Sequence, residues 1–487
     1  MLGKPIFEIN ENVLVLGAST SNEVQDGGFS PSTTQVNMTN TPGVCFQPAP
    51  ATDKSTNLTG QMIASCEDPS TSYSRLFVST DGDADGRFYS STSDGTLTAR
   101  GSEDTGANYV QGKTDMVAYK NEAYITNSQY IVRWSGIGGA NTFNTTFFDF
   151  TSVPPTPSAN ATTAPHPALV YEDNIYYGNG NILLRQTSAG GTPAAVLTLP
   201  AGQVIVALGA DPGSGKMLIS VIGQINLSDT INSDARVLYY DGFSNKASKL
   251  VIVDQMITAF PTSAGAVYAA YGNNLGYWNG AGTTFLRNFS AIGYNNEQLF
   301  YKQHFTNIGS TLYFIVRDTL WAHGPIIQGS THTFYPAKDA SLESATDLTH
   351  VTNLGSGNLA FSFATSKFYT WNTTSITVGG QSVLHSNEIT FDRPYWVRRI
   401  KIWFKNPMVS GVTNAGFVQI YADNIFQTPN PGNSAFIKNE TGADSYVAEI
   451  KNLEFKCDII QMLINMNVSY NLGIHRIVGY GEPADRP

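Results

Sequence analysis

The sequence predicts an all-β protein with three parts: an extended N-terminal arm over residues 1–69, a β-propeller of six or seven blades over 70–380, and a jelly-roll-like β-sandwich over 381–487. Three observations predict this fold. One segment of short predicted strands occurs twice at a fixed spacing. Only 14% of the residues are charged, and Gly, Ser, Thr and Asn are abundant, which suits short strands joined by tight turns. After residue 380 the pattern changes to longer strands with alternating faces.

The repeated segment defines the predicted blade. Residues 117–134 read VAYKNEAYITNSQYIVRW, and residues 169–186 read LVYEDNIYYGNGNILLRQ. Five matched pairs share the same offset of 52 residues: Tyr119/Tyr171, Asn121/Asp173, Tyr124/Tyr176, Asn127/Asn179 and Arg133/Arg185. Each copy predicts an apolar strand, a polar turn, a Tyr-centred strand, an Asn-rich turn and a third apolar strand. A period of about 50 residues made only of short strands is typical of propeller blades.

Other predicted strands follow the same cadence. Residues 74–80 and 87–91 flank one Asp-Gly turn, and residues 204–209 and 216–222 flank another turn, so each pair predicts a hairpin. Several predicted strands end in an aromatic residue with glycine shortly after it. The aromatic is expected to pack between blades, and the glycine to take the positive φ of the next turn. These endings are Trp134-Ser-Gly, Tyr240-Asp-Gly, Trp278-Asn-Gly and Trp321-Ala-His-Gly, and further middle strands are predicted at 266–271, 312–316 and 359–363.

The N-terminal residues do not repeat. Phe7–Leu16 predicts one strand, and the tract after it, GGFSPSTTQVNMTNTPGVCFQPAPATDKS, is too polar to form a core. We expect this arm to lie over another part of the assembly or to be ordered by a neighbour. The first residues show neither a signal peptide nor a membrane span of about 18 apolar residues, so a membrane span is not expected.

The C-terminal residues predict a β-sandwich without a repeat. In Ile400-Lys-Ile-Trp-Phe404, residues 400, 402 and 404 are expected to face one way, and Lys401 and Trp403 the other. The predicted strands are Glu388–Phe391, Trp396–Phe404, Phe417–Tyr421, Tyr446–Phe455, Ile459–Met466 and Ile474–Tyr480.

Composition and spacing argue against several functions. The net charge of −10 disfavours specific nucleic-acid binding, because phosphate contacts need clustered Lys and Arg. Three cysteines, Cys45, Cys66 and Cys457, have no metal-ligand spacing and are expected to be inert, although a Cys45–Cys66 bridge stays open. The seven histidines are scattered, at positions 166, 304, 323, 332, 350, 385 and 475, and each is expected to be a surface or core residue.

Three short motifs suggest chemistry but fit it poorly. Asp81-Gly-Asp-Ala-Asp-Gly86 opens like a calcium loop, yet Tyr89 and Thr92 stand where further oxygen ligands belong, so we interpret it as a hairpin turn. The Gly209–Lys216 segment lacks the residues and the following helix of a phosphate loop. Ser91–Thr96 resembles the Asp-box turn of sialidase-type propellers, which stabilises a turn and is not catalytic. We therefore assign no catalytic residue, no metal ligand and no cofactor, and predict that the protein is not an enzyme.

The layout as a whole resembles the β-propeller structural proteins of tailed-phage virions, including nozzle or tail-tubular proteins. The resemblance is carried by the N-terminal tract, the aromatic-x-Gly propeller and the closing sandwich that ends Ile474-His-Arg-Ile-Val-Gly-Tyr. It implies a non-enzymatic virion subunit in the tail that forms a homo-oligomeric ring and contacts other tail proteins. Such a protein is made in the host cytoplasm and released in the virion by lysis.

Two alternatives stay open. A carbohydrate-binding adhesin or receptor-binding protein, with a host surface glycan as partner, is suggested by the aromatic and cationic residues of Tyr395–Trp403, which core packing also explains. A propeller glycosidase or sialidase would need carboxyl groups that converge at the centre of the disc.

Overall fold

The computed structural model contains two compact units. One comprises Asp53–Arg317 and Thr346–Thr370, and the other comprises Met1–Thr52, Asp318–Ala345 and Trp371–Pro487. The described residues are 4–9, 38–39, 47–48, 51–81, 85–103, 106–223, 234–289, 300–325, 332–339, 346–372, 381–385, 389–423, 425–427, 435–439, 441, 443–467, 472 and 474–484. Helix within these ranges is limited to α2 (Asn160–Thr163) and the 3-10 turns η2 (Ser55–Asn57), η3 (Phe150–Ser152) and η4 (Lys302–His304).

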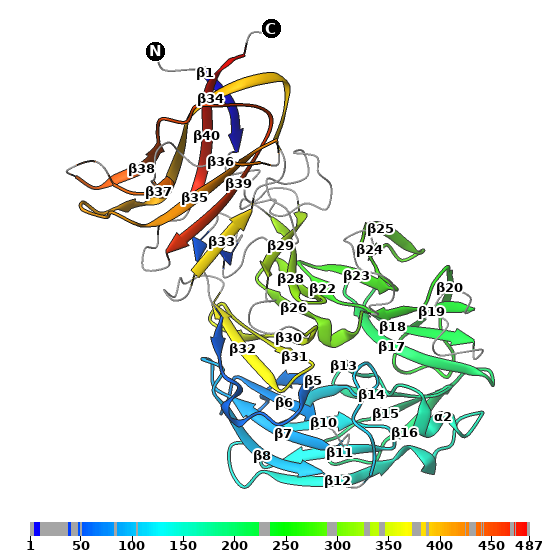
Figure 1. Ribbon diagram of the computed structural model, residues 1–487. Helices are drawn as coiled ribbons and strands as arrows, with labels where there is room; N and C mark the ends of the chain where they lie inside the picture. The colour runs from blue at the N-terminus through cyan, green and yellow to red at the C-terminus, as the bar shows by residue number, and fades with distance from the viewer. Residues whose placement is uncertain are drawn as a thin grey trace. The chain divides into compact units, whose positions relative to one another are not determined.

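Seven antiparallel sheets form the blades of a β-propeller, which confirms the predicted propeller of six or seven blades (Figure 1). Blades 1 and 2 are β5 (Gln61–Glu67), β6 (Arg75–Thr80), β7 (Gly86–Ser91) and β8 (Leu97–Glu103), then β9 (Met116–Tyr119), β10 (Glu122–Thr126), β11 (Tyr130–Ser135) and β12 (Thr142–Asp149). Blades 3 and 4 are β13 (Ala168–Tyr171), β14 (Asn174–Asn179), β15 (Ile182–Gln186) and β16 (Ala194–Thr198), then β17 (Gln203–Asp211), β18 (Lys216–Gly223), β19 (Ala235–Tyr240) and β20 (Lys249–Val253).

The remaining blades follow the same plan. Blade 5 is β21 (Ile257–Ala259), β22 (Thr262–Ser263), β23 (Ala266–Tyr271), β24 (Asn274–Trp278) and β25 (Thr283–Asn288). Blade 6 is β26 (Phe305–Ile308), β27 (Thr311–Val316), β28 (Thr319–Pro325) and β29 (His332–Asp339), and blade 7 begins with β30 (Leu348–Gly355), β31 (Asn358–Phe363) and β32 (Lys367–Asn372). The predicted middle strands correspond to β23, β27 and β31.

Blade 7 is completed by β4 (Thr52–Asp53), which comes from the chain before blade 1 and pairs with β32. The amide of Lys54 donates to the carbonyl of Phe368 at 2.8 Å, and the amide of Phe368 donates to Oγ of Ser55 at 2.9 Å. The first strands of the last and first blades, β30 and β5, also lie side by side. The chain before residue 70 therefore takes part in the propeller, through β4 in blade 7 and β5 in blade 1, whereas the sequence places the start of the propeller at residue 70.

The repeated residues connect neighbouring blades. The Tyr119 hydroxyl donates to the carbonyl of Asp173 in blade 3 at 2.6 Å, and the Tyr171 hydroxyl donates to the carbonyl of Gly215 in blade 4 at 2.7 Å. The second tyrosine of each copy also reaches the next blade. The Tyr124 hydroxyl accepts a bond from the amide of Gly190 at 2.8 Å, and the Tyr176 hydroxyl donates to the carbonyl of Gly242 at 3.0 Å.

The aromatic-x-Gly endings behave as predicted in three cases. Trp134, Tyr240 and Trp278 are buried against a neighbouring blade. The glycines that follow, Gly136, Gly242 and Gly280, have φ of 64°, 84° and 84°. The fourth ending is different, because Gly324 lies inside β28 and not in the following turn.

Nine strands of the C-terminal region form one sheet. They are β1 (Lys4–Ile9), β33 (Gln381–His385), β34 (Ile389–Met408), β35 (Gly416–Ala422), β36 (Ile425–Gln427), β37 (Ala435–Ile437), β38 (Ser445–Ile450), β39 (Phe455–Asn467) and β40 (Ile474–Pro483). Their inward side chains build a separate apolar core. β1 pairs with β40, so the N-terminal strand belongs to this sheet, and the short strands β2 (Met38–Thr39) and β3 (Gln47–Pro48) pair with each other.

The structure corrects the bounds of two predicted stretches of strand. β1 covers Lys4–Ile9, and residues 10–16 of the strand predicted at Phe7–Leu16 lie outside the described residues. Glu388–Phe391 and Trp396–Phe404 are predicted as two strands, but β34 continues through Pro394, where its pairing with β39 is irregular. Proline fits there because it has no amide to donate to a regular ladder. Tyr446–Phe455 is predicted as one strand, but residues 451–454 separate β38 from β39, and Asn452 has a φ of 59°.

The predicted alternation of β34 is confirmed. Ile400, Ile402 and Phe404 are at most 1% exposed and lie in the C-terminal core, whereas Lys401 and Trp403 are only partly buried. The jelly-roll arrangement stays a prediction. So does the extended arm, because most of the residues between 10 and 50 lie outside the described residues.

Candidate functional site

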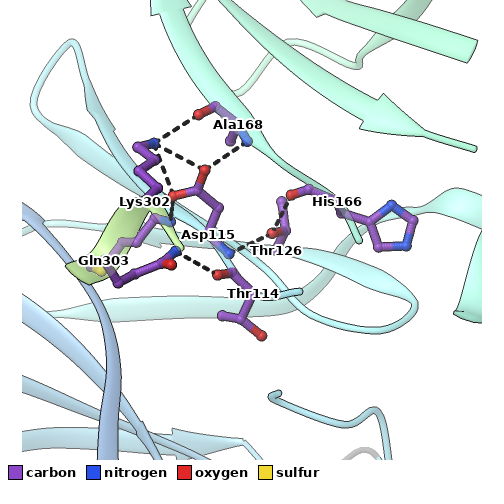
Figure 2. Close-up of polar contacts among 8 residues, drawn as sticks. Thr114, Asp115, Thr126, His166, Ala168, Lys302 and Gln303 are labelled. Atoms are coloured by element: carbon purple, nitrogen blue, oxygen red, sulfur yellow. Dashed lines mark hydrogen bonds and ion pairs between the residues drawn. The ribbon is translucent and has the colours of Figure 1, made fainter. Parts of the chain in front are cut away.

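The centre of the propeller is held by a lysine–aspartate pair (Figure 2). Nζ of Lys302 lies 2.9 Å from each carboxylate oxygen of Asp115 and 2.9 Å from the carbonyl oxygen of Ala168. The same carboxylate accepts bonds from the amides of Ala168 at 2.9 Å and Met116 at 2.8 Å. A lysine ammonium has three donors, so all three are used here.

Three blades meet at this pair. Lys302 lies in η4 directly before β26 of blade 6, Asp115 directly before β9 of blade 2, and Ala168 at the start of β13 of blade 3. The Asp115 side chain is 7% exposed and that of Lys302 is 44% exposed. The pair therefore links blade 6 to blades 2 and 3, and the carboxylate is the more buried of the two charged groups.

The neighbours of the pair extend this network, which we call the hub. Nε2 of Gln303 donates to the carbonyl of Thr114 at 2.9 Å. Nε2 of Gln111 donates to the carbonyl of Thr349, in β30 of blade 7, at 3.0 Å and lies 2.9 Å from Nε2 of His304. The hub is thus a set of polar side chains that bind backbone groups of other blades.

Small cavities lie beside the hub. One of about 30 Å³ is lined by residues that include Asp115, Pro167, Val206 and Lys302, and one of about 120 Å³ is lined by residues that include Gln111, Lys113, Met256 and Tyr301. Both are smaller than the several hundred cubic ångströms typical of ligand pockets. The hub side chains contact one another and backbone groups of other blades.

Three buried histidines surround the hub. Burial lowers the pKa of His166 to about 4 and the pKa values of His304 and His350 to about 3. The His166 ring stacks on Phe150 at a centroid distance of 3.8 Å, and its Nδ1 lies 2.9 Å from the carbonyl oxygen of Gly178. Desolvation disfavours the charged imidazolium, so these rings are core residues that are neutral at pH 7.

Two of the three cysteines lie in the described part of the chain. Cys66 and Cys457 are buried free thiols, and burial raises the pKa of each to about 12. A thiol with a raised pKa stays protonated at neutral pH and is a poor nucleophile and metal ligand. Cys45 lies outside the described residues, so the bridge to Cys66 stays an open alternative.

The suggested calcium loop lies partly outside the described residues, which include Asp81 and Asp85 but not residues 82–84. Oδ2 of Asp81 accepts bonds from Nη2 and Nε of Arg87 at 3.0 and 3.2 Å, so a cation already neutralises this carboxylate. Within the described ranges, no group of three or more His, Cys, Asp or Glu side chains could hold a metal ion.

The other two motifs are turns. The segment Gly209–Lys216 is followed by strand β18, paired with β17, where a phosphate loop would be followed by a helix. The Asp94 carboxylate accepts bonds from Thr92, Thr96 and Lys54, and the bond from the Thr92 hydroxyl is the main cause of the lowered pKa of Asp94. This carboxylate stabilises its own turn.

The aromatic and cationic side chains of β34 form a layer on the side away from the C-terminal core. The guanidinium carbon of Arg398 lies 5.4 Å from the Trp396 ring centroid, and that of Arg399 lies 4.5 Å from the Tyr480 centroid. Arg476 of β40 covers Trp403 at 5.0 Å. These rings are not core residues, and cations over their faces compete with a sugar for the same surface.

Comparisons with known proteins add only distant fold likeness. No protein-family model matches the chain, and no curated protein matches it. A chain in "Crystal Structure of Mitotic Checkpoint Complex" is 9% identical, with a TM-score of 0.43, over 69% of this chain and 96% of that one. A chain in "Structure of Dos1 propeller" is 10% identical, with a TM-score of 0.40, over 66% of this chain and 94% of that one. A search of the described residues for a helix able to cross a membrane found none.

Proposed function

We propose that this protein is a non-enzymatic structural subunit of a phage virion, placed in the tail and assembled into a homo-oligomeric ring with other tail proteins as partners. The observation that carries the proposal is the hub, where Lys302 and Asp115 use their charges and hydrogen bonds to join blades. A glycosidase needs carboxyl groups that face a substrate, and the Asp115 carboxyl faces Lys302.

The outer strands supply contact surface. Leu250 and Ile252 of β20 are 49% and 73% exposed, Phe285 of β25 is 58% exposed, and Phe243 in the loop before β20 is 69% exposed. Exposed large apolar side chains on neighbouring blades favour burial against another protein surface. The extended polar arm and a jelly-roll-like C-terminal sandwich would give further contacts of the ring, as expected for a segment that orders on assembly.

The proposal is tested by asking where the protein is found and how it assembles. Mass spectrometry of purified virions should detect it at a fixed copy number, and light scattering of the purified protein should show a closed oligomer. A variant with Leu250→Ser and Ile252→Ser should stay folded and lose oligomer, whereas Val409→Ser, at a 52% exposed position outside the propeller rim, should not. Absence from virions, or hydrolysis of an aryl glycoside that requires Asp115, would contradict the proposal.

A carbohydrate-binding adhesin is a second candidate. It is favoured by the partly buried layer of Trp396, Trp403 and Tyr480, since aromatic and cationic groups together are common in sugar-binding faces. Binding of host surface glycans that is lost in Trp403→Ala but retained in the Leu250→Ser/Ile252→Ser variant would support it over a purely structural role.

A further inference from the structure

A groove between blades 4 and 5 has the composition of a ligand site that is separate from the hub. Its volume is about 580 Å³, within the range typical of ligand pockets. Three turns or strand ends line it: the β17–β18 turn with Ser214 and Lys216, the start of β20 with Lys249, and the end of β24 with Trp278 and Asn279.

The floor of the groove is aromatic and held in place. The indole nitrogen of Trp278 donates to the hydroxyl of Tyr239 at 2.7 Å, and the two rings lie 6.3 Å apart. Trp278 is 7% exposed and Tyr239 is 4% exposed, so only part of each ring faces the groove. Such a floor offers a small apolar surface of fixed geometry beneath polar walls, which suits the C–H face of a sugar ring.

The walls carry two lysines. Nζ of Lys249 lies 5.1 Å from the Tyr239 centroid and donates to the carbonyl of Gly280 at 2.5 Å. Nζ of Lys216 donates to Oγ of Ser248 at 2.9 Å. These bonds fix the positions of both ammonium groups and leave each with donors for a ligand, because a lysine ammonium has three.

Among the described residues that line the groove, the single carboxylate is that of Asp211, and its own turn engages it. Oδ1 of Asp211 accepts from the amide of Gly213 at 2.9 Å, and Oδ2 accepts from the hydroxyl of Ser214 at 2.7 Å. Two cations therefore face one hydrogen-bonded anion, and the groove favours a negatively charged ligand although the whole chain carries −10.

From this geometry we infer that the groove binds an acidic oligosaccharide, with a sugar ring against Trp278 and a carboxylate between Lys216 and Lys249. Hydroxyl groups of the sugar would meet Ser214, Ser248 and Asn279 on the walls. This inference does not depend on a place in a virion, and it uses none of the residues of the hub or of the C-terminal sheet.

The experiment measures binding to the full chain by isothermal titration calorimetry with four probes. Hexagalacturonate should bind, and neutral maltohexaose should bind at least about tenfold more weakly. Added salt should lower the affinity for hexagalacturonate, because salt screens exposed charges. A sulfated maltohexaose, which carries sulfate and no carboxylate, separates the two anions, and binding equal to that of hexagalacturonate would overturn the carboxylate assignment. Hexaglutamate tests whether charge alone is enough, and equal binding of this peptide would overturn the saccharide assignment.

Two variants locate the site. K216Q/K249Q should lower the affinity for hexagalacturonate on the order of tenfold, since each exposed charge contact contributes modestly to binding. The matched control K120Q/K367Q removes the same charge at 42% and 45% exposed lysines of other blades and should bind as the wild type does. S214W fills the groove without changing its charge and should abolish binding. Wild-type binding by K216Q/K249Q or S214W, or failure of hexagalacturonate to bind the folded wild type, would overturn the inference.

Discussion

The hydroxyl of Tyr119 lies 2.6 Å from the carbonyl oxygen of Asp173, one blade further along the chain. Its counterpart Tyr171 makes the same kind of bond, to Gly215 at 2.7 Å. The tyrosines that recur in the sequence therefore join blade 2 to blade 3 and blade 3 to blade 4, so this part of the repeat marks the interfaces between blades.

Tyr119→Phe should lower the free energy of unfolding by about 1 kcal/mol, because it removes a hydrogen bond between blades and leaves the ring in place. The measurement is urea denaturation followed by tryptophan fluorescence. Tyr446→Phe is the matched control, since Tyr446 is 54% exposed. Equal stability of the two variants would mean that the bond to Asp173 contributes nothing measurable.

Lys302→Met should destabilise the propeller by about 2–3 kcal/mol, because it leaves the 7% exposed Asp115 carboxylate without its cation. This expected loss of stability is smaller than for a fully buried ion pair, because the Lys302 side chain is 44% exposed. The double variant Asp115→Asn/Lys302→Met should recover part of the loss in a thermal or urea melt.

Lys367→Met is the control for the hub variant. Lys367 lies 3.5 Å from Asp53 with both side chains nearly half exposed, so its loss should cost less than about 1 kcal/mol. A Lys302→Met protein as stable as this control would show that the hub pair does not hold the blades together.

The propeller should lose stability as the pH falls from about 6.5 towards 4. An unfolded histidine takes up a proton near pH 6.5, whereas burial lowers the pKa of folded His166 to about 4. The unfolded state therefore binds more protons in this window, and each such histidine contributes up to about 1.4 kcal/mol per pH unit.

His166→Leu should make this pH dependence shallower, as read from urea midpoints at pH 7 and pH 4.5. Val409→Ser, which changes no titratable group at a 52% exposed position, should leave the slope unchanged. A wild-type midpoint that does not move between these pH values would contradict the burial of neutral imidazoles.

Deleting residues 18–37 should leave the propeller folded, because these residues lie before every strand of the blades. The shortened protein should no longer assemble, because the proposed locking arm is lost. The sequence alone predicts that residues 18–55 are dispensable for folding, but Thr52–Asp53 form β4 of blade 7. Deleting 18–55 should therefore also lower the melting temperature. Normal assembly of the shorter deletion, measured by light scattering, would rule out a locking role for the arm.

The periodicity of the sequence predicts most of the propeller, because strands and turns have local sequence patterns. No sequence pattern predicts the hub, because Asp115 and Lys302 are far apart in sequence and belong to no motif. The sequence does not predict β4 either, because a strand of two residues is too short to show alternating polar and apolar side chains. The sequence predicts two strands, at Glu388–Phe391 and Trp396–Phe404, and only the pairing with β39 shows one strand, β34, with an irregularity between Thr390 and Tyr395.

Blade 7 is closed by two segments that are synthesised at very different times. Ser55 leaves the ribosome long before Phe368, its hydrogen-bonding partner 313 residues away, so early blades have formed while the disc is still open. Pairings of such long sequence separation form slowly and leave strand edges exposed meanwhile. Blade 7 can therefore close only once Phe368 has been made, by pairing with a segment synthesised long before it, and a nascent chain that stalls before residue 367 exposes the unpaired strand edges of an incomplete propeller.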